Sequence, residues 1–231
     1  MEFLIVLIAA ALACTLLRNP IKRWPWAFYA LTVALVVLFV CGAYLPLPRP
    51  LWSLLLVLVQ KCMLPLALFV VVMYIGVLAR DSKARTWLRP IRAELSIAAW
   101  ILSLGHMTMY LATYAPRLGA GRVDGNVLVS LALALVLFAL LLVLGVTSFN
   151  MVKKRMKADT WKRVQRLAYP FFGLVYVHLL LMLLPSAVQG GAAAQASVIA
   201  YTAVFGLYAV LRVTRALLDR RMAAPVEEVR A

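Results

Sequence analysis

Long apolar runs, separated by short segments rich in proline, glycine or basic residues, dominate this sequence of 231 residues. Hydrophobic residues make up 65% of the chain, whereas a soluble domain is only about half apolar. Apolar runs of roughly 20 residues are long enough to cross a bilayer as helices, which satisfy their backbone polar groups without water. The sequence therefore predicts an all-α, polytopic membrane helix bundle that forms a single transmembrane domain over residues 1–231.

The runs and their breakers predict about seven transmembrane helices. They are expected at residues 3–17, 26–45, 52–79, 92–114, 127–149, 165–184 and 197–217. The first run is preceded by Glu2, where a signal peptide would carry a basic residue, so we expect it to be retained as a helix. The third run is long enough to tilt or to extend beyond the membrane.

Basic residues gather in alternate loops. They cluster at 18–23, 80–92, 153–166 and 212–221, whereas the other loops hold only Arg49, Arg117 and Arg122. The positive-inside rule then places the N-terminus outside and the C-terminus inside a cell (plasma) membrane. We expect the basic loop at 153–166 to contact anionic lipid head groups.

Several classes of function are disfavoured by composition. The net charge of +16 is explained by the loop pattern, so no nucleic-acid partner is expected. Phosphate-loop and dinucleotide fingerprints are lacking, and the spans leave little room for a soluble domain, so we expect no flavin site. Cys14, Cys41 and Cys62 are scattered through apolar runs, which favours core packing over an iron–sulfur cluster or zinc site.

The two histidines of the chain, His106 and His178, each lie inside an apolar run. An ionisable side chain within a span is a functional-site hypothesis by default. His106 follows Arg92 by about 14 residues and His178 follows Arg166 by about 12, so a helical rise of 1.5 Å places both about 20 Å above the inner boundary. Both helices are expected to run from inside to outside. The two imidazoles should therefore share a level in the outer half of the bilayer.

Two imidazoles at the same depth on neighbouring helices are the axial ligand pair of a b-type haem. The alternative is hydrogen bonding between helices. Zinc is disfavoured, because its sites need three or four protein ligands and no further cysteine or carboxylate lies at this level on these two helices. The sequence thus predicts His106 and His178 as haem-iron ligands.

Two segments carry a family resemblance. They are TSFNMVKKRMKADTWKRVQRLAYPFFGLVYVHL, from Thr147 to Leu179, and WLRPIRAELSIAAWILSLGHMTMYL, at 87–111. Both resemble the ferric reductase-like transmembrane family, over about residues 51–217. That family includes the haem-binding membrane subunit of the bacterial methionine sulfoxide reductase system, ferric-chelate reductases and NADPH oxidases.

The resemblance implies that His106 and His178 occupy ligand positions. In bacterial members another histidine precedes the second by 13 residues, in W-x-x-L-H-R-L-x-Y, but Gln165 stands there in this chain. On the other helix, Arg92 and Ala93 stand where an inner-leaflet ligand would be expected. Two-haem members stack an inner and an outer haem, so we expect this chain to hold one haem b, the outer one.

An outer haem would lie far from a cytoplasmic flavoprotein. We therefore expect quinol as electron donor, with an extracytoplasmic reductase or flavoprotein as the candidate partner. The chain would then be the membrane subunit of an oxidoreductase. Direct reduction of a ferric chelate is an alternative, and a non-redox transporter or membrane assembly protein is the alternative from another class. The lack of paired intramembrane carboxylates disfavours the transporter.

Several other charged residues and one tryptophan have expected roles near the haem or the membrane surface. Lys61 is expected close to the haem level, either snorkelling to the interface or binding a haem propionate or a quinol oxygen. Arg117 and Arg122 are propionate candidates, with plain solvation as the alternative. Glu94 is expected to pair with loop arginines, and Trp161 to anchor at the interface.

Overall fold

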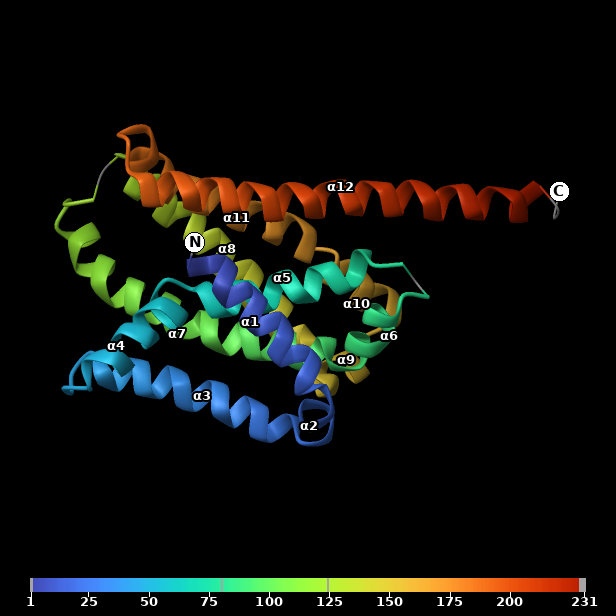
Figure 1. Ribbon diagram of the computed structural model, residues 1–231, viewed down its shortest axis with the longest axis horizontal. Helices are drawn as coiled ribbons and strands as arrows, with labels where there is room; N and C mark the ends of the chain where they lie inside the picture. Colours follow the sequence, from blue (N-terminus) through green and yellow to red (C-terminus); the bar gives the residue numbers. More distant parts are fainter. Residues whose placement is uncertain (1, 80, 124, 229–231) are drawn as a thin grey trace.

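The computed structural model describes residues 2–79, 81–123 and 125–228 as a bundle of helices (Figure 1). The elements are α1 (Glu2–Leu16), α2 (Arg18–Arg23), α3 (Pro25–Gly42), α4 (Arg49–Leu55), the π-helix η1 (Leu56–Gln60), α5 (Met63–Val77), α6 (Lys83–Leu88), the 3₁₀-helix η2 (Arg89–Ile91), α7 (Arg92–Gly119), α8 (Gly125–Ser148), α9 (Asn150–Arg155), α10 (Ala158–Gln165), α11 (Ala168–Val188) and α12 (Ala192–Glu228). Every element in these ranges is helical, which confirms the all-α prediction.

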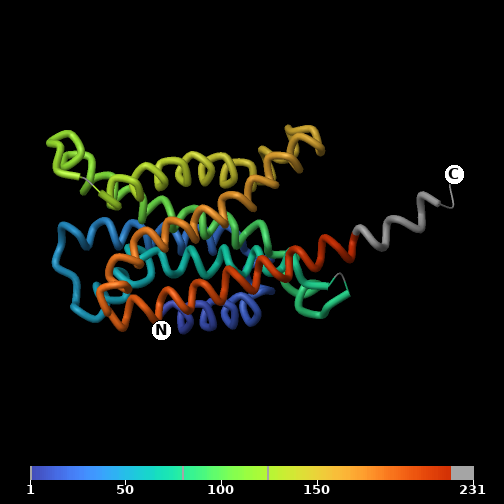
Figure 2. Tube along the Cα trace, turned by 90° about the horizontal axis from the view of Figure 1, so that it is seen from above, coloured from blue at the N-terminus to red at the C-terminus, as the bar shows by residue number. Residues whose placement is uncertain are grey.

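α5 lies at the centre of the bundle, packed against α1, α7 and α12. Most of its side chains are buried. Around it, α3 packs against α7, and α11 packs against both α8 and α12. The long helices run along one axis in both views (Figures 1 and 2). A helix that is apolar all round, as α5 is, belongs at such a centre.

Five helical stretches are long and apolar enough to cross a membrane. They are Pro25–Gly42, Lys83–Gly119, Gly125–Ser148, Ala158–Val188 and Ala192–Asp219. A sixth span is formed if Arg49–Gln60 and Met63–Val77, which meet at 44°, count as one. α1 has 15 residues, fewer than a full crossing of roughly 20. The expected seven spans are therefore not confirmed, although a helix occurs at each of the seven positions.

The basic segments lie at one end of the bundle. α2, α6, α9 and α10 gather there, and both α7 and α11 start from that end (Figure 1). The two histidine-bearing helices thus run in the same direction, as expected from the loop charges. Which end faces the cytoplasm stays a prediction.

The third apolar run differs from expectation. A continuous helix was expected over 52–79, but the run consists of α4, η1 and α5 with a break at Lys61 and Cys62. Cys62 has a φ of 56°, the left-handed conformation that non-glycine residues rarely adopt. Pro65 contributes to the break, because its ring lacks an N–H and would clash with the carbonyl of Lys61 in a continuous helix.

Candidate functional site: two intramembrane histidines

His106 lies on α7 opposite the break in the third run. Its Nδ1 is 2.6 Å from the main-chain oxygen of Gln60. A carbonyl oxygen can only accept a hydrogen bond, so Nδ1 of His106 must carry the proton and donate it. The neutral imidazole then keeps a free lone pair on Nε2, the form that binds a metal.

The oxygen of Gln60 is free for this bond because the helical ladder is broken there. In a regular helix it would accept from the N–H of Leu64. Instead, the N–H of Lys61 bonds the oxygen of Leu56, and the N–H of Cys62 bonds the oxygen of Val59. Irregular backbone at membrane depth is tolerated where protein buries it and its polar groups find partners. His106 provides such a partner.

His178 lies on α11 and faces α8. Its Nδ1 is 3.0 Å from the hydroxyl oxygen of Ser130, a residue only 2% exposed. A hydroxyl can donate or accept, so this bond is compatible with either tautomer. When Nδ1 of His178 donates to Ser130, its Nε2 is also free as a ligand atom.

The two histidines lie on helices that start from the same end of the bundle (Figure 1). They belong to different sides of the bundle, since α7 packs mainly against α3 and α5 whereas α11 packs mainly against α8 and α12. Among the described residues, no group of three or more His, Cys, Asp or Glu side chains could hold a metal ion. The arrangement therefore suits a group that takes one nitrogen from each of two helices.

A ligand set of this kind fits a haem. Metal-binding histidines almost always donate their other ring N–H to a carbonyl, carboxylate or similar acceptor, which fixes the tautomer and the ring orientation. Gln60 supplies the acceptor for His106, and Ser130 can supply it for His178. Both partners come from helices that pack against the ligand helix, so each imidazole is held from outside its own helix.

Comparison with known proteins now identifies the family. Residues 58–176 match the family described as "Ferric reductase like transmembrane component". The chain belongs to the ferric reductase-like transmembrane family. Over 157 residues it is 45% identical to a protein of Treponema pallidum (strain Nichols) described as "Uncharacterized protein". The match covers 67% of this chain but 43% of that relative, so the chain spans less than half of the relative's length. No solved structure matches the present chain.

In this ferric reductase-like chain, Gln165 has a packing role at the basic end. Its amide Nε2 donates to the hydroxyl of Thr147 at 2.9 Å. The indole N–H of Trp161 donates to the main-chain oxygen of the same threonine, also at 2.9 Å. Both contacts fasten α10 to the end of α8. Trp161 was expected only as an interfacial anchor, and its role here is a specific hydrogen bond.

Aromatic side chains fill the bundle between that end and the histidines. The indole of Trp100 packs so closely on Gly145 that a Cβ there would overlap it. Trp100 also meets Phe149 edge-on, with ring centroids 5.7 Å apart. Phe69 and Phe171 form a second edge-on pair at 5.5 Å. These rings come from α5, α7 and α11 and from the residue after α8, so they occupy the space that those helices enclose.

The charged candidates lie at the opposite end. Lys61 is ion-paired with Glu2, Nζ to Oε2 at 3.0 Å, and both side chains are more than half exposed. Arg117 lies over the ring of Tyr114, 5.5 Å from its centroid. Tyr114 stacks on Tyr110, whose ring is 4.7 Å from that of His106. A row of aromatic rings thus leads from Arg117 to the imidazole of His106.

Two other expectations about charges have definite outcomes. Arg122 is exposed, and its main-chain N–H bonds the oxygen of Arg117 in the turn that ends α7. Glu94 was expected to pair with loop arginines, but its Oε2 is buried without a hydrogen-bond partner in the described part of the chain. That expectation is wrong, because Glu94 lies near Tyr29 of α3 on the packed side of α7.

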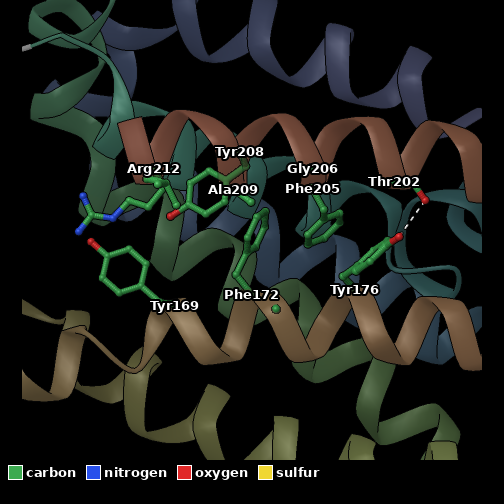
Figure 3. A pocket seen from close by; sticks show the side chains of 11 residues that line it. Tyr169, Phe172, Tyr176, Thr202, Phe205, Gly206, Tyr208, Ala209 and Arg212 are labelled. Carbon is green, nitrogen blue, oxygen red and sulfur yellow. Dashed lines mark hydrogen bonds between the residues drawn. The ribbon is translucent and has the colours of Figure 1, made fainter. Parts of the chain in front are cut away.

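A groove of about 470 Å³ runs between α11 and α12 (Figure 3). Its aromatic lining includes Phe172, Tyr176, Phe205 and Tyr208. At one end, the guanidinium of Arg212 lies 4.6 Å from the ring centre of Tyr169. At the other end, the hydroxyls of Tyr176 and Thr202 are hydrogen-bonded at 2.8 Å. Sequence reasoning missed this groove, since its residues are spread over two helices whose pairing the sequence does not specify.

Proposed function

We propose that this chain is a haem b protein of the plasma membrane that relays electrons from quinol to an acceptor outside the cytoplasm. Its family indicates electron transfer in a membrane. The observation that carries the proposal is the hydrogen bonding of the two histidines: Nδ1 of His106 donates to Gln60, and Nδ1 of His178 can donate to Ser130, which leaves Nε2 of each for a metal. A bound haem would supply one-electron redox chemistry, while the chain supplies ligands and orientation.

The residues divide the work of holding such a group. His106 and His178 would hold the iron of such a group, one from α7 and one from α11. Gln60 and Ser130 hold the imidazoles in the ligating orientation. Arg117 is the better candidate for a propionate, because Lys61 is already neutralised by Glu2.

A single haem is supported by how the chain uses the space on the basic side of the histidines. Gln165 stands in the place of the family's inner histidine, and its amide donates a hydrogen bond to the hydroxyl of Thr147. Trp100, packed against Gly145 and Phe149, fills the neighbouring space. A planar macrocycle there would have to displace closely packed rings, at the cost of their contacts.

Quinol is supported as donor by the groove between α11 and α12. A quinone ring can stack on its aromatic lining, and the guanidinium of Arg212 can donate to a quinone oxygen. Tyr176 faces the groove and His178, two residues later, faces α8. Only the thickness of α11 therefore separates the groove from the ligand histidine.

The decisive experiment is spectroscopic. The purified chain should show a reduced-minus-oxidised haem b spectrum, with one haem per chain by pyridine haemochrome. His106→Ala and His178→Ala should each abolish the low-spin signal, since either leaves at most one protein ligand. A haem-to-chain ratio near zero or near two would contradict the proposal, as would wild-type spectra in both variants.

The acceptor is tested separately. Purified protein reduced by quinol analogue would be mixed with a ferric chelate on one hand and with periplasmic or extracellular reductase candidates on the other. We propose the protein acceptor. Rapid reoxidation by a range of simple ferric chelates would instead favour the ferric-chelate reductase that the family description suggests.

A further inference from the structure

We propose that the break in the third run is a positioning device for His106. The main-chain oxygen of Gln60, released from its helix, fixes the Nδ1–H tautomer and the ring plane of that ligand. The effect on a bound haem rests on the proposed function, whereas the hydrogen bond between His106 and Gln60 involves only residues of the chain.

The hydrogen-bond pattern around the break shows why Gln60 is involved. The bond from Lys61 N–H to Leu56 oxygen spans five residues, and the next, from Cys62 N–H to Val59 oxygen, spans three. The ladder resumes with the N–H of Leu66 on the oxygen of Cys62. The oxygen of Gln60 lies between these bonds and is directed to His106. A single-turn π-helix of this kind is often found at a functional site.

Local backbone geometry maintains the break. Cys62 adopts the left-handed conformation at φ 56°, and α5 begins directly after it. Pro65 prevents the helix from closing over Lys61, because it has no N–H to offer. Non-glycine residues in this conformation persist only where the surrounding structure enforces it, and they cluster at functional sites.

Gly105 brings the break close to His106. It directly precedes the histidine, and a Cβ on it would come within 3.3 Å of Val59 in η1 and 2.9 Å of Val36 in α3. Val59 and Gly105 are both buried. The absence of a side chain at Gly105 thus lets both α3 and η1 lie close to α7 at the turn that carries His106.

The consequence is an asymmetric ligand pair. A carbonyl acceptor on Nδ1–H makes the imidazole a stronger electron donor, and such outer partners tune a metal site. His106 has this fixed acceptor, whereas His178 has a hydroxyl that can rotate. The Gln60 contact should lower the reduction potential of a haem bound by His106.

The first test reads the tautomer without any haem. The full chain, labelled with ¹⁵N-histidine in haem-deficient cells and placed in nanodiscs, has only two imidazoles to resolve. His178→Ala assigns them. His106 should show a single Nδ1–H tautomer with a strong hydrogen bond. An Nε2–H tautomer, or exchange between the two, would overturn the inference whether or not the chain binds haem.

The second test perturbs the approach of η1. Gly105→Ala should loosen the Gln60 contact, so that His106 samples both tautomers and the haem midpoint potential rises while haem content is retained. Gly119→Ala is the matched control on the same helix, since a Cβ there meets nothing within 4 Å in the described structure. Pro65→Ala provides a second route to the same shift. Unchanged tautomer and potential in both folded variants would overturn the positioning role, whereas loss of haem from the wild type would overturn the proposed function alone.

Discussion

The hydroxyl of Ser130 lies 3.0 Å from Nδ1 of His178 and is almost fully buried between α8 and α11. Ser130→Ala removes this partner and leaves a ring nitrogen of His178 unsatisfied. Loss of an outer hydrogen-bond partner typically weakens metal binding by about 10- to 100-fold. We expect haem to dissociate correspondingly more readily, measured by transfer to apomyoglobin.

Ser197→Ala is the control for this change, because that hydroxyl bonds the Ala193 oxygen of its own helix. It should leave the transfer rate unchanged. Equal rates in wild type, Ser130→Ala and Ser197→Ala would show that Ser130 does not support His178.

Gln165 should matter for stability and not for haem. Gln165→Ala removes the bond to Thr147 and should cost about 0.5–1.5 kcal/mol of unfolding free energy. The haem spectrum and stoichiometry should remain those of the wild type, because the glutamine is occupied at the end of α8. Thermal unfolding in detergent and absorbance spectra of the same samples measure both. Loss of haem in this variant would mean that Gln165 helps to hold it.

Gly145 should tolerate no side chain. Gly145→Ala would force the Trp100 indole out of its position, and overpacking of this kind typically costs about 1–3 kcal/mol. Gly173→Ala, in α11, has open space around its Cβ in the described structure, and it should be neutral or slightly stabilising, because alanine favours a helix by up to about 1 kcal/mol. Comparison of their unfolding midpoints checks the close packing of Trp100 on Gly145. A tolerant Gly145 would indicate that Trp100 leaves room there.

The pattern of the sequence was sufficient to predict the helical class, the approximate positions of the seven helical segments and the common direction of the two helices that carry the histidines. Each rests on a long-range average, either of hydropathy or of loop charge, which one irregular residue barely alters. The structure places His106 on α7 and His178 on α11, which start from the same end of the bundle (Figure 1). Their role as ligands stays a prediction.

The break at Lys61 and Cys62 was not predicted, because it depends on local hydrogen bonding inside an uninterrupted apolar run. Pro65 was the available signal, since a proline inside such a run marks a probable helix boundary nearby. Ser130 was missed for a different reason: a serine in an apolar helix is common, and only its tertiary partner distinguishes it. The role of Gln165 likewise depends on how α10 folds back on α8, which hydropathy does not encode.

The proposal that quinol binds in the groove between α11 and α12 can be tested separately. Gly206 lines it, and Gly206→Leu would fill it with a branched side chain. Reduction of the haem by quinol should slow at least about tenfold, if the quinol loses roughly 1.4 kcal/mol of binding. Reduction by dithionite and the haem content should not change. Ala203→Leu, exposed on α12 outside the groove, is the control, and slowing in both variants would argue against the groove as the quinol site.

The last prediction concerns direction. α7 and α11 start from the end where the basic segments gather (Figure 1), and His106 and His178 follow the basic residues Arg92 and Arg166 by about 14 and 12 residues. If that end is cytoplasmic, as the basic loops predict, the haem lies nearer the outer face. In vesicles of known orientation, with the haem reduced through quinol, a membrane-impermeant oxidant should act rapidly from the outer side and slowly from the cytoplasmic side. The opposite preference would contradict either the topology or the depth of the histidines. Labelling of a cysteine introduced beside Arg117 with an impermeant thiol reagent would distinguish these, because only the topology determines on which side that residue reacts.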